Sequence, residues 1–196
     1  AGTSWTGPTG GGDIKEILGK HVFDSMGEIV DPKHTALVVI DMQNDFCSAD
    51  GLFAKSGMNV SMLEELMPRL SAFVEAARKV GVMVLHTQNT TLPNGRRDSP
   101  AWVRTKAMAC HDPEYTLEGS WGQAFCSGME PLKDEPVIKK HRSSGFVETN
   151  MDMVLRSSGI QSLIVTGCLS DGCVLATALQ ARFLNYYVVV PGDCIG

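Results

Sequence analysis

The segment Ala36–Asp41, ALVVID, is a short apolar run rich in β-branched residues that ends in a carboxylate. Four further runs of similar character follow it along the chain. Runs of this length without strict polar alternation are typical of strands buried on both faces of a sheet, and four of the five fit that description. The predicted strands are Ala36–Asp41, Val82–Thr87, Pro136–Lys139, Ser162–Gly167 and Tyr186–Pro191.

Segments between these runs have helical periodicity. Apolar residues recur at helical spacing from Ser61 until Gly81, and Ser61 with Glu64 forms a capping-box pattern at the start. Pro68 lies inside the pattern and is expected to kink or split the helix. Two more helices are expected, over Thr149–Ser157 and Gly172–Leu184.

Strands that alternate with helices predict an α/β fold with a doubly wound, mainly parallel sheet and helices on both faces, a Rossmann-like three-layer α/β/α architecture. Residues 13–196 are expected to form a single domain, and the Gly-rich residues 1–12 a flexible arm or a tag remnant. Thr90–Gly128 carries many Pro and Gly residues and is predicted to be irregular. Because the sequence stops at Gly196 shortly after a strand, a covering C-terminal helix is expected to be missing.

Composition excludes several classes of function. Seventeen Lys and Arg against 22 Asp and Glu give a net charge of −5 without a basic stripe, which argues against nucleic acid as a partner. The apolar runs are far shorter than the ~18 residues of a membrane span, so no membrane role is expected. Six cysteines without a CxxC pair or a secretory leader predict reduced thiols and a cytoplasmic location.

Chemically useful side chains follow the predicted strands. In doubly wound sheets, ligands bind beyond the carboxyl ends of the strands. Such positions are occupied by Asp41, by Lys139 and Lys140, and by Cys168 and Cys173, which supply a carboxylate, an ammonium group and a thiol, a set suited to nucleophilic catalysis. At the first turn of the predicted helix Gly172–Leu184, the helix dipole would favour the thiolate of Cys173 and backbone N–H groups would form an oxyanion hole.

Other interpretations of the same residues remain open. A single Cys is more often a buried structural residue than a nucleophile. A non-catalytic binding protein could use the same fold. A redox or thiol-sensing role would pair Cys168 with Cys173, although that pairing requires Cα atoms within ~7 Å of each other.

Three ordered motifs carry a resemblance to a known family. ALVVIDMQNDF (Ala36–Phe46), KKHRSSGF (Lys139–Phe146) and VTGCLSDGCVLATA (Val165–Ala178) resemble the isochorismatase-like cysteine hydrolases. The resemblance implies that Asp41, Lys140 and Cys173 are catalytic. It also implies a cis peptide bond between Cys168 and Leu169, from which we assign the oxyanion hole to the backbone N–H groups of Leu169 and Cys173.

The resemblance also bears on cofactors and substrates. The nicotinamidase branch holds a metal through several His and Asp residues, but the stretch HTQNTTLPNGRR has His86 as its only imidazole, so neither a metal nor an organic cofactor is expected. The presence of Cys173 favours amide-type hydrolysis. The stretch SDGC, Ser170–Cys173, departs from the family's Thr-Asn-x-Cys, and this difference bears on the substrate rather than the reaction class.

These observations predict a cysteine amidohydrolase closest to the ureidoacrylate and N-carbamoyl amidohydrolase branch. It would cleave a linear amide, ureido or carbamoyl bond of a small molecule through an acyl-enzyme and release ammonia. The alternatives are another isochorismatase-like hydrolase, a nicotinamidase-type amidase or a non-catalytic binding protein. The chain is expected to be a homo-oligomer, and the residues predicted to bind substrate are Asn89, Trp121, Arg142 and Gln43.

Overall fold

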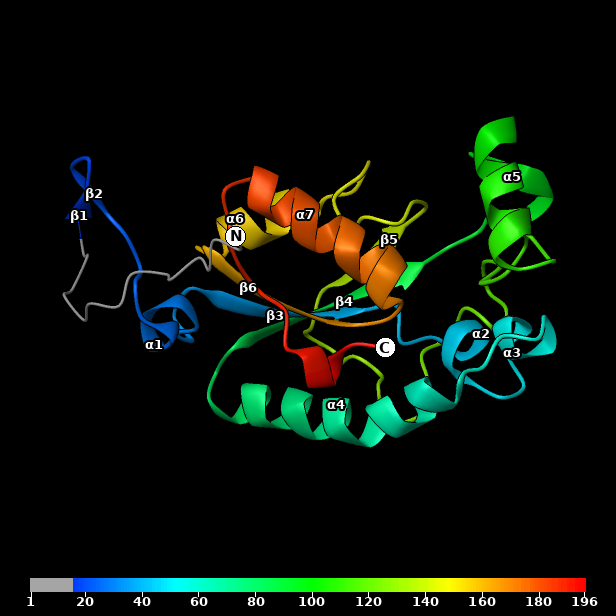
Figure 1. Cartoon of the computed structure of the whole chain (residues 1–196), viewed down its shortest axis with the longest axis horizontal. Coiled ribbons are helices and arrows are strands. Elements are labelled where there is room, and N and C mark those ends of the chain that lie inside the picture. Colours follow the sequence, from blue (N-terminus) through cyan, green and yellow to red (C-terminus); the bar gives the residue numbers. More distant parts are fainter. Residues whose placement is uncertain (1–15) are drawn as a thin grey trace, which may run out of the picture.

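A computed structural model describes residues 16–196 and contains a five-stranded sheet in which every neighbouring pair of strands is parallel. The strand order is β5-β4-β3-β6-β7, so the chain winds outward from β3 in both directions (Figure 1). This is the doubly wound α/β sheet predicted from the sequence. The strands of this sheet are β3 (Thr35–Ile40), β4 (Met83–Asn89), β5 (Val137–Lys140), β6 (Ser162–Gly167) and β7 (Tyr187–Val189).

Helices cover both faces of this sheet. The long helix α4 lies on one face, and α6 and α7 lie on the other (Figure 1). A small hairpin of β1 and β2 and the short helix α1 precede the sheet, at the end opposite the carboxyl ends of the strands (Figure 1). The elements outside the main sheet are β1 (Glu16–Ile17), β2 (Lys20–His21), α1 (Met26–Ile29), α2 (Asn44–Cys47), α3 (Leu52–Lys55), α4 (Ser61–Lys79), η1 (Pro93–Gly95), α5 (Pro100–Ala109), α6 (Met151–Ser157), η2 (Ser170–Val174), α7 (Leu175–Phe183) and η3 (Gly192–Cys194).

The central strand β3 supplies side chains to both layers of the core. Leu37 and Val39 pack with the buried face of α4, whereas Val38 and Ile40 pack in the cluster that includes α6 and α7. Successive side chains of a strand point to opposite faces, so a strand covered on both sides must be apolar throughout. All six residues of β3 are buried, which explains why this strand reads as an uninterrupted apolar run.

Helix α4 differs from the prediction in two respects. The prediction at Pro68 was a kink or a split, and the split is wrong because α4 is one helix with Pro68 inside it. Its N-cap residue is Val60 and no side chain caps it, so the predicted capping box of Ser61 and Glu64 is wrong as well. Burial of one whole face of this long helix against the sheet stabilises it enough to offset the hydrogen bond lost at Pro68.

Two other segments also differ from the prediction. The stretch expected to be irregular contains the ten-residue helix α5, which begins with Pro100 at its first turn and is capped by the Ser99 side chain. The helix predicted over Gly172–Leu184 is in fact a π-helical turn, η2, followed by α7. The predicted arm, residues 1–12, lies outside the described residues. No helix within residues 16–196 is long and apolar enough to span a membrane.

The end of β6 passes very close to the end of β3. Gly167 has a φ of +98°, and a Cβ atom at this position would lie 2.2 Å from the backbone oxygen of Ile40. That oxygen accepts a hydrogen bond from the N–H of Cys168. Glycine therefore allows the two strands to end side by side, which brings the residue after each strand to the same place.

We predict that Gly167→Ala lowers the free energy of unfolding by about 2–4 kcal/mol, because the added methyl group meets backbone and the φ value is unfavourable for alanine. Urea unfolding followed by circular dichroism measures the change. Gly192→Ala is the matched control, since a Cβ atom there has no neighbour within 4 Å, and it should change stability by less than about 0.5 kcal/mol. Equal effects of the two substitutions would contradict the role given to Gly167.

Candidate active site

Asp41 follows β3 directly and is completely buried. It has a positive φ of 48°, which turns the chain at the edge of the sheet. The Thr87 hydroxyl donates a 2.7 Å hydrogen bond to Oδ1 of Asp41 and accepts one from the Asp41 N–H. Thr87 thereby fixes the carboxylate from the neighbouring strand β4 and leaves Oδ2 facing the other site residues.

Lys140 is the last residue of β5 and is also completely buried. Its Nζ lies 2.6 Å from Oδ2 of Asp41 and donates a hydrogen bond to the carbonyl of Arg142. The preceding Lys139 points the other way and is largely exposed, as the alternation of a strand requires. Burial opposes the charge on Lys140, but Asp41 and Cys173 together outweigh burial and raise the pKa of the ammonium group above its usual value.

Cys173 lies in η2, between the end of β6 and α7. Nζ of Lys140 donates a 3.2 Å hydrogen bond to its Sγ, so the ammonium group contacts both the carboxylate and the thiol. Burial and the Asp41 carboxylate raise the pKa of Cys173 to about 12, although Lys140 acts in the opposite direction. Burial and the Asp41 carboxylate thus act against the thiolate that the helix N-terminus alone was predicted to favour.

The backbone next to Cys173 includes a cis peptide bond and a tight turn. The peptide bond between Cys168 and Leu169 is cis, as the resemblance implied. The N–H groups of Gly172 and Val174 both donate to the Leu169 carbonyl. Among the described residues, the N–H groups of Leu169 and Cys173 donate no hydrogen bond outside their own turn. These two are the donors predicted for the oxyanion hole.

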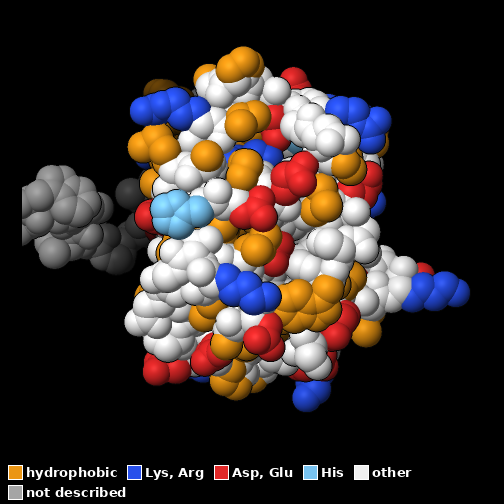
Figure 2. Space-filling view, turned by 90° about the vertical axis from the view of Figure 1, so that its right-hand side faces the viewer, with side chains coloured by type: hydrophobic (Ala, Val, Ile, Leu, Met, Phe, Trp, Pro, Cys, Tyr) orange, Lys and Arg blue, Asp and Glu red, His pale blue; other side chains and the backbone are white. Residues whose placement is uncertain are grey.

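A cavity of about 370 Å³ opens onto Cys173. Four aromatic side chains, one each from α2, α3, α5 and the loop after α5, form much of its wall, and polar groups are few. Figure 2 views the molecule from this end, and hydrophobic, acidic and some basic side chains are interspersed across the middle of that face. The residues that line the cavity include Phe46, Phe53, Trp102, Tyr115, Asn89, Ser143, Leu169, Asp171 and Cys173.

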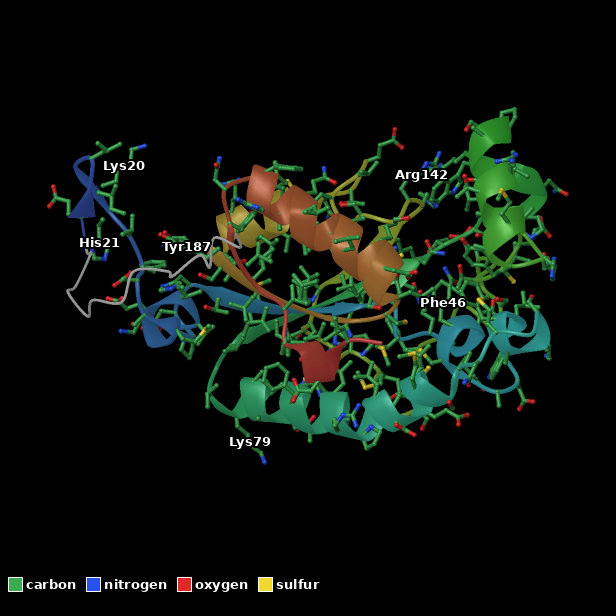
Figure 3. All side chains as sticks on the ribbon, viewed as in Figure 1. Lys20, His21, Phe46, Lys79, Arg142 and Tyr187 are labelled. Carbon is green, nitrogen blue, oxygen red and sulfur yellow. The ribbon has the colours of Figure 1, made fainter. Side chains whose placement is uncertain are left out.

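The predicted substrate-binding residues are not all brought to this cavity. Asn89 lines it. The Gln43 side chain is buried and holds loops together through the backbone of Asn89 and Gln123. Trp121 is about half exposed and does not line the cavity. Arg142 belongs to the loop after β5 and lies on the side of that loop nearer to α5 (Figure 3), where it stacks on Trp102 and pairs with Asp98.

Sequence reasoning missed several residues of the site. The Thr87 hydroxyl was hidden inside an apolar run, although a polar residue at the end of a buried strand is a usable signal. Trp102 and Tyr115 fall in the segment predicted to be irregular. Phe46 belongs to α2, which lies below α5 in Figure 3, and its sequence context gave no sign that it faces a cavity.

Cys168 and His86 have partners other than the side chains of Asp41, Lys140 and Cys173. The Cys168 thiol lies 3.7 Å from that of Cys47 and donates a hydrogen bond to the Asp41 carbonyl, so it does not face Cys173 as a redox pair would. His86 is buried in the middle of β4 against Glu135. Within residues 16–196, no group of three or more His, Cys, Asp or Glu side chains is arranged to hold a metal ion.

The arrangement provides the elements of covalent acyl transfer. A neutral thiol lies beside a carboxylate whose Oδ2 receives no hydrogen bond of regular geometry and is available as a proton acceptor. The ammonium group of Lys140 contacts both this carboxylate and the thiol. The cavity gives a small molecule access to the thiol.

Comparison with known proteins gives consistent matches. The Isochorismatase domain family matches residues 35–196. Ureidoacrylate amidohydrolase RutB of Yersinia enterocolitica is 32% identical over 169 residues, which are 81% of this chain and 74% of that protein. The solved structure of N-carbamoylsarcosine amidase from Thermoplasma acidophilum matches with a TM-score of 0.69 and 27% sequence identity. The match covers 83% of this chain and 84% of the amidase chain. An isochorismatase-like hydrolase from Alkaliphilus metalliredigens has a TM-score of 0.70, also at 27% identity, with 83% and 82% covered.

We predict that Asp41→Asn lowers the pKa of Cys173, because it removes a negative charge that raises this pKa while Lys140 remains. The rate of alkylation of Cys173 by iodoacetamide, followed by peptide mass mapping, reports the thiolate. In the wild type this rate should climb without a plateau up to about pH 10, well below the pKa of about 12. In Asp41→Asn the profile should move at least about one pH unit lower. A profile that stays in place would contradict the coupling.

Proposed function

This chain belongs to the isochorismatase family and is a hydrolase of carbon–nitrogen bonds, and we propose that Cys173 is its nucleophile. The proposed reaction cleaves a linear amide, ureido or carbamoyl bond of a small molecule through an acyl-enzyme and releases ammonia. The observation that carries the proposal is the contact of one buried ammonium group, that of Lys140, with both Asp41 and Cys173.

The first step joins the substrate to the enzyme. Asp41 accepts the thiol proton of Cys173 while Sγ attacks the carbonyl carbon, so that the thiolate does not have to exist free in a buried site. The carbonyl oxygen becomes negatively charged. The N–H groups of Leu169 and Cys173 donate hydrogen bonds to it, and Lys140 offsets the charge that has moved onto the substrate.

The tetrahedral intermediate then collapses. The carbon–nitrogen bond breaks, Asp41 gives its proton to the departing nitrogen, and ammonia leaves. A thioester on Cys173 and an ionised Asp41 remain. Water next loses a proton to Asp41 and attacks the thioester, the carbon–sulfur bond breaks, and the proton returns to Sγ. One water is consumed, one acid and one ammonia are formed, and the enzyme is unchanged.

A binding protein without catalytic activity is the weaker alternative. Burying an ammonium group, a carboxylate and a thiol together is costly, and apolar residues of similar size often fill such a place with equal or greater stability. The complete burial of Asp41 and Lys140 beside an accessible cavity therefore favours a chemical role for them.

We predict that Cys173→Ala abolishes the release of ammonia, with a fall of at least about 1,000-fold, because no other group in the site can form the thioester. The measurement is ammonia release from a panel of ureido acids, carbamoyl amino acids and simple amides. Cys194→Ser is the matched control, since this thiol lies in η3 and does not line the cavity. Activity that survives Cys173→Ala would refute the proposed nucleophile.

The covalent intermediate can also be trapped. Hydroxylamine attacks a thioester and releases the acyl group as a hydroxamate, regenerating the thiol. We therefore expect hydroxamate to form at the expense of free acid when the enzyme turns over a substrate in the presence of hydroxylamine. Mass spectrometry quantifies both products. Unchanged free acid with no hydroxamate, at concentrations that leave ammonia release unaffected, would argue for direct attack by water.

A further inference from the structure

The cavity beside Cys173 is lined mainly by apolar side chains. Four of them are the aromatic residues described above, and Met58, Ala109 and Leu169 extend the same lining. The polar lining residues, apart from the nucleophile and the aromatic ones, are Asn89, Thr105, Ser143 and Asp171. The space next to the reactive sulfur is therefore better suited to hydrocarbon than to groups that need hydrogen bonds.

The aromatic part of the wall is a packed cluster. The rings of Phe46, Phe53 and Tyr115 contact one another with centroids 4.8 to 5.7 Å apart, and all three side chains are buried. They come from α2, α3 and the loop after α5, so three segments hold one another in place. A wall that is formed in advance binds an apolar group without first having to be ordered.

Helix α5 presents one of its faces to the cavity. Trp102, Thr105 and Ala109 line it, and these residues are spaced as neighbours on one side of a helix. The Thr105 hydroxyl donates a 3.0 Å hydrogen bond to the carbonyl four residues earlier in α5. The side-chain amide of Asn89 likewise donates to the Thr116 hydroxyl. These hydrogen bonds within the protein leave fewer polar groups for a bound molecule.

Two cations adjoin the aromatic wall without being among the lining residues. Nζ of Lys106 lies 5.7 Å from the centre of the Tyr115 ring and pairs with Asp98. Arg142 lies 5.1 Å from the centre of the Trp102 ring and pairs with the same carboxylate. Two cations against one carboxylate leave positive charge beside the wall, which is compatible with an acidic group on a bound molecule. The apolar lining thus bears on the carbon skeleton of that molecule rather than on its charge.

The volume of the cavity sets the size of the group that fits. The cavity holds about 370 Å³. An apolar protein cavity of roughly 150 Å³ already binds a benzene molecule, so this one has room for an aromatic ring or a chain of about six carbons together with the reacting carbonyl. Each methylene group moved from water into such a wall favours binding by about threefold. An apolar group on the substrate would therefore contribute strongly to binding.

We infer that this cavity is a binding pocket for an apolar acyl substituent. The substrates of the enzyme then carry an aromatic ring or an aliphatic chain of up to about six carbons, attached directly or through nitrogen to the carbonyl carbon that Cys173 attacks. The inference deepens the proposed function and rests on it for the identity of the reaction. The preference for apolar groups concerns only binding beside Cys173, so it can be tested separately from hydrolysis.

The first test measures binding through the rate at which Cys173 is alkylated. N-methylmaleimide and N-hexylmaleimide differ only in the length of an alkyl chain that is remote from the reacting double bond. In both cases Sγ bonds to one carbon of the double bond, the thiol proton is transferred to the other carbon, and no group leaves. Peptide mass mapping gives the rate. We expect the ratio of the hexyl to the methyl rate to be at least about tenfold higher at Cys173 than for the free thiol N-acetylcysteinamide. Because both reagents need the same thiolate, this ratio does not depend on the pKa of Cys173.

Two pairs of variants show whether the cavity is responsible. Ser143→Phe places a ring in the cavity and should bring the ratio to within about threefold of that of the free thiol. Ser157→Phe, at an exposed position of α6, should leave the ratio high. Ala109→Asp adds a charge to the lining and should lower the ratio at least about threefold. Ala107→Asp adds the same charge to an exposed position of the same helix outside the lining and should not lower it. A ratio at Cys173 no higher than that of the free thiol, or one unchanged by both Ser143→Phe and Ala109→Asp, would overturn the inference.

Hydrolysis provides the second test. Pentanamide and 3-methoxypropanamide have the same chain length, as do butylurea and (2-methoxyethyl)urea, and in each pair an oxygen replaces one methylene group. We expect kcat/KM to be at least about fivefold higher for the all-carbon chain of a pair, and Ser143→Phe to reduce this difference. Equal or faster turnover of the methoxy compounds would overturn the inference. Absence of turnover of all of these compounds, with the alkylation ratio as expected, would instead count against the proposed function and leave the apolar pocket standing.

Discussion

The ion pair between Asp41 and Lys140 is the interaction on which the rest of the site depends. Both side chains are completely removed from water, and each would cost several kcal/mol to bury alone. The pair can be buried because other groups form hydrogen bonds with it. The Thr87 hydroxyl donates a hydrogen bond to the carboxylate, and the ammonium group donates hydrogen bonds to the Arg142 carbonyl and the Cys173 sulfur. Removing either charge would leave the other without compensation.

This requirement fixes where three strands end. Asp41, Thr87 and Lys140 come from β3, β4 and β5, which are adjacent in the sheet. The register pairs Val39 with His86 and Asn89 with Lys140, so the three side chains meet only with this alignment. A slip of one residue would turn Lys140 outward and bring Lys139 inward. The Asp41 carboxylate would then lose its ion pair with Lys140. The register of the sheet and the geometry of the site are therefore one constraint.

The parts of the molecule that sequence could predict are those that buried parallel strands determine. Apolar runs such as that of β3 mark strands covered on both faces, and a polar residue directly after such a run falls at the carboxyl edge. Asp41 was found in this way, whereas the choice of Lys140 over Lys139 came from the resemblance to a known family. Cys173 was found as well, but not its environment, because the pKa of a thiol depends on burial and on charges contributed by distant strands.

Helix α5 shows why the remaining parts could not be predicted. It buries only Lys106 completely, so its sequence lacks the apolar periodicity of α4. Its position depends on Asp98, which pairs with Lys106 from α5 and with Arg142 from the loop after β5. That contact joins residues more than 40 positions apart. The aromatic side chains that line the cavity and the hydrogen bonds of Gln43 to neighbouring loops could not be predicted for the same reason. They form only after the sheet has brought distant segments of the chain together.

The proposed chemistry follows from conservation of charge within the buried triad. Before attack, the site holds an ionised carboxylate, an ammonium group and a neutral thiol; after transfer of the thiol proton it holds a carboxylic acid, an ammonium group and a thiolate. The net charge is zero in both states, so the proton transfer places no additional uncompensated charge in a medium of low polarity. A thiol pKa of about 12 is compatible with nucleophilic attack for this reason. The proton needs to move only to Asp41, and Lys140 contacts both the group that loses the proton and the group that gains it.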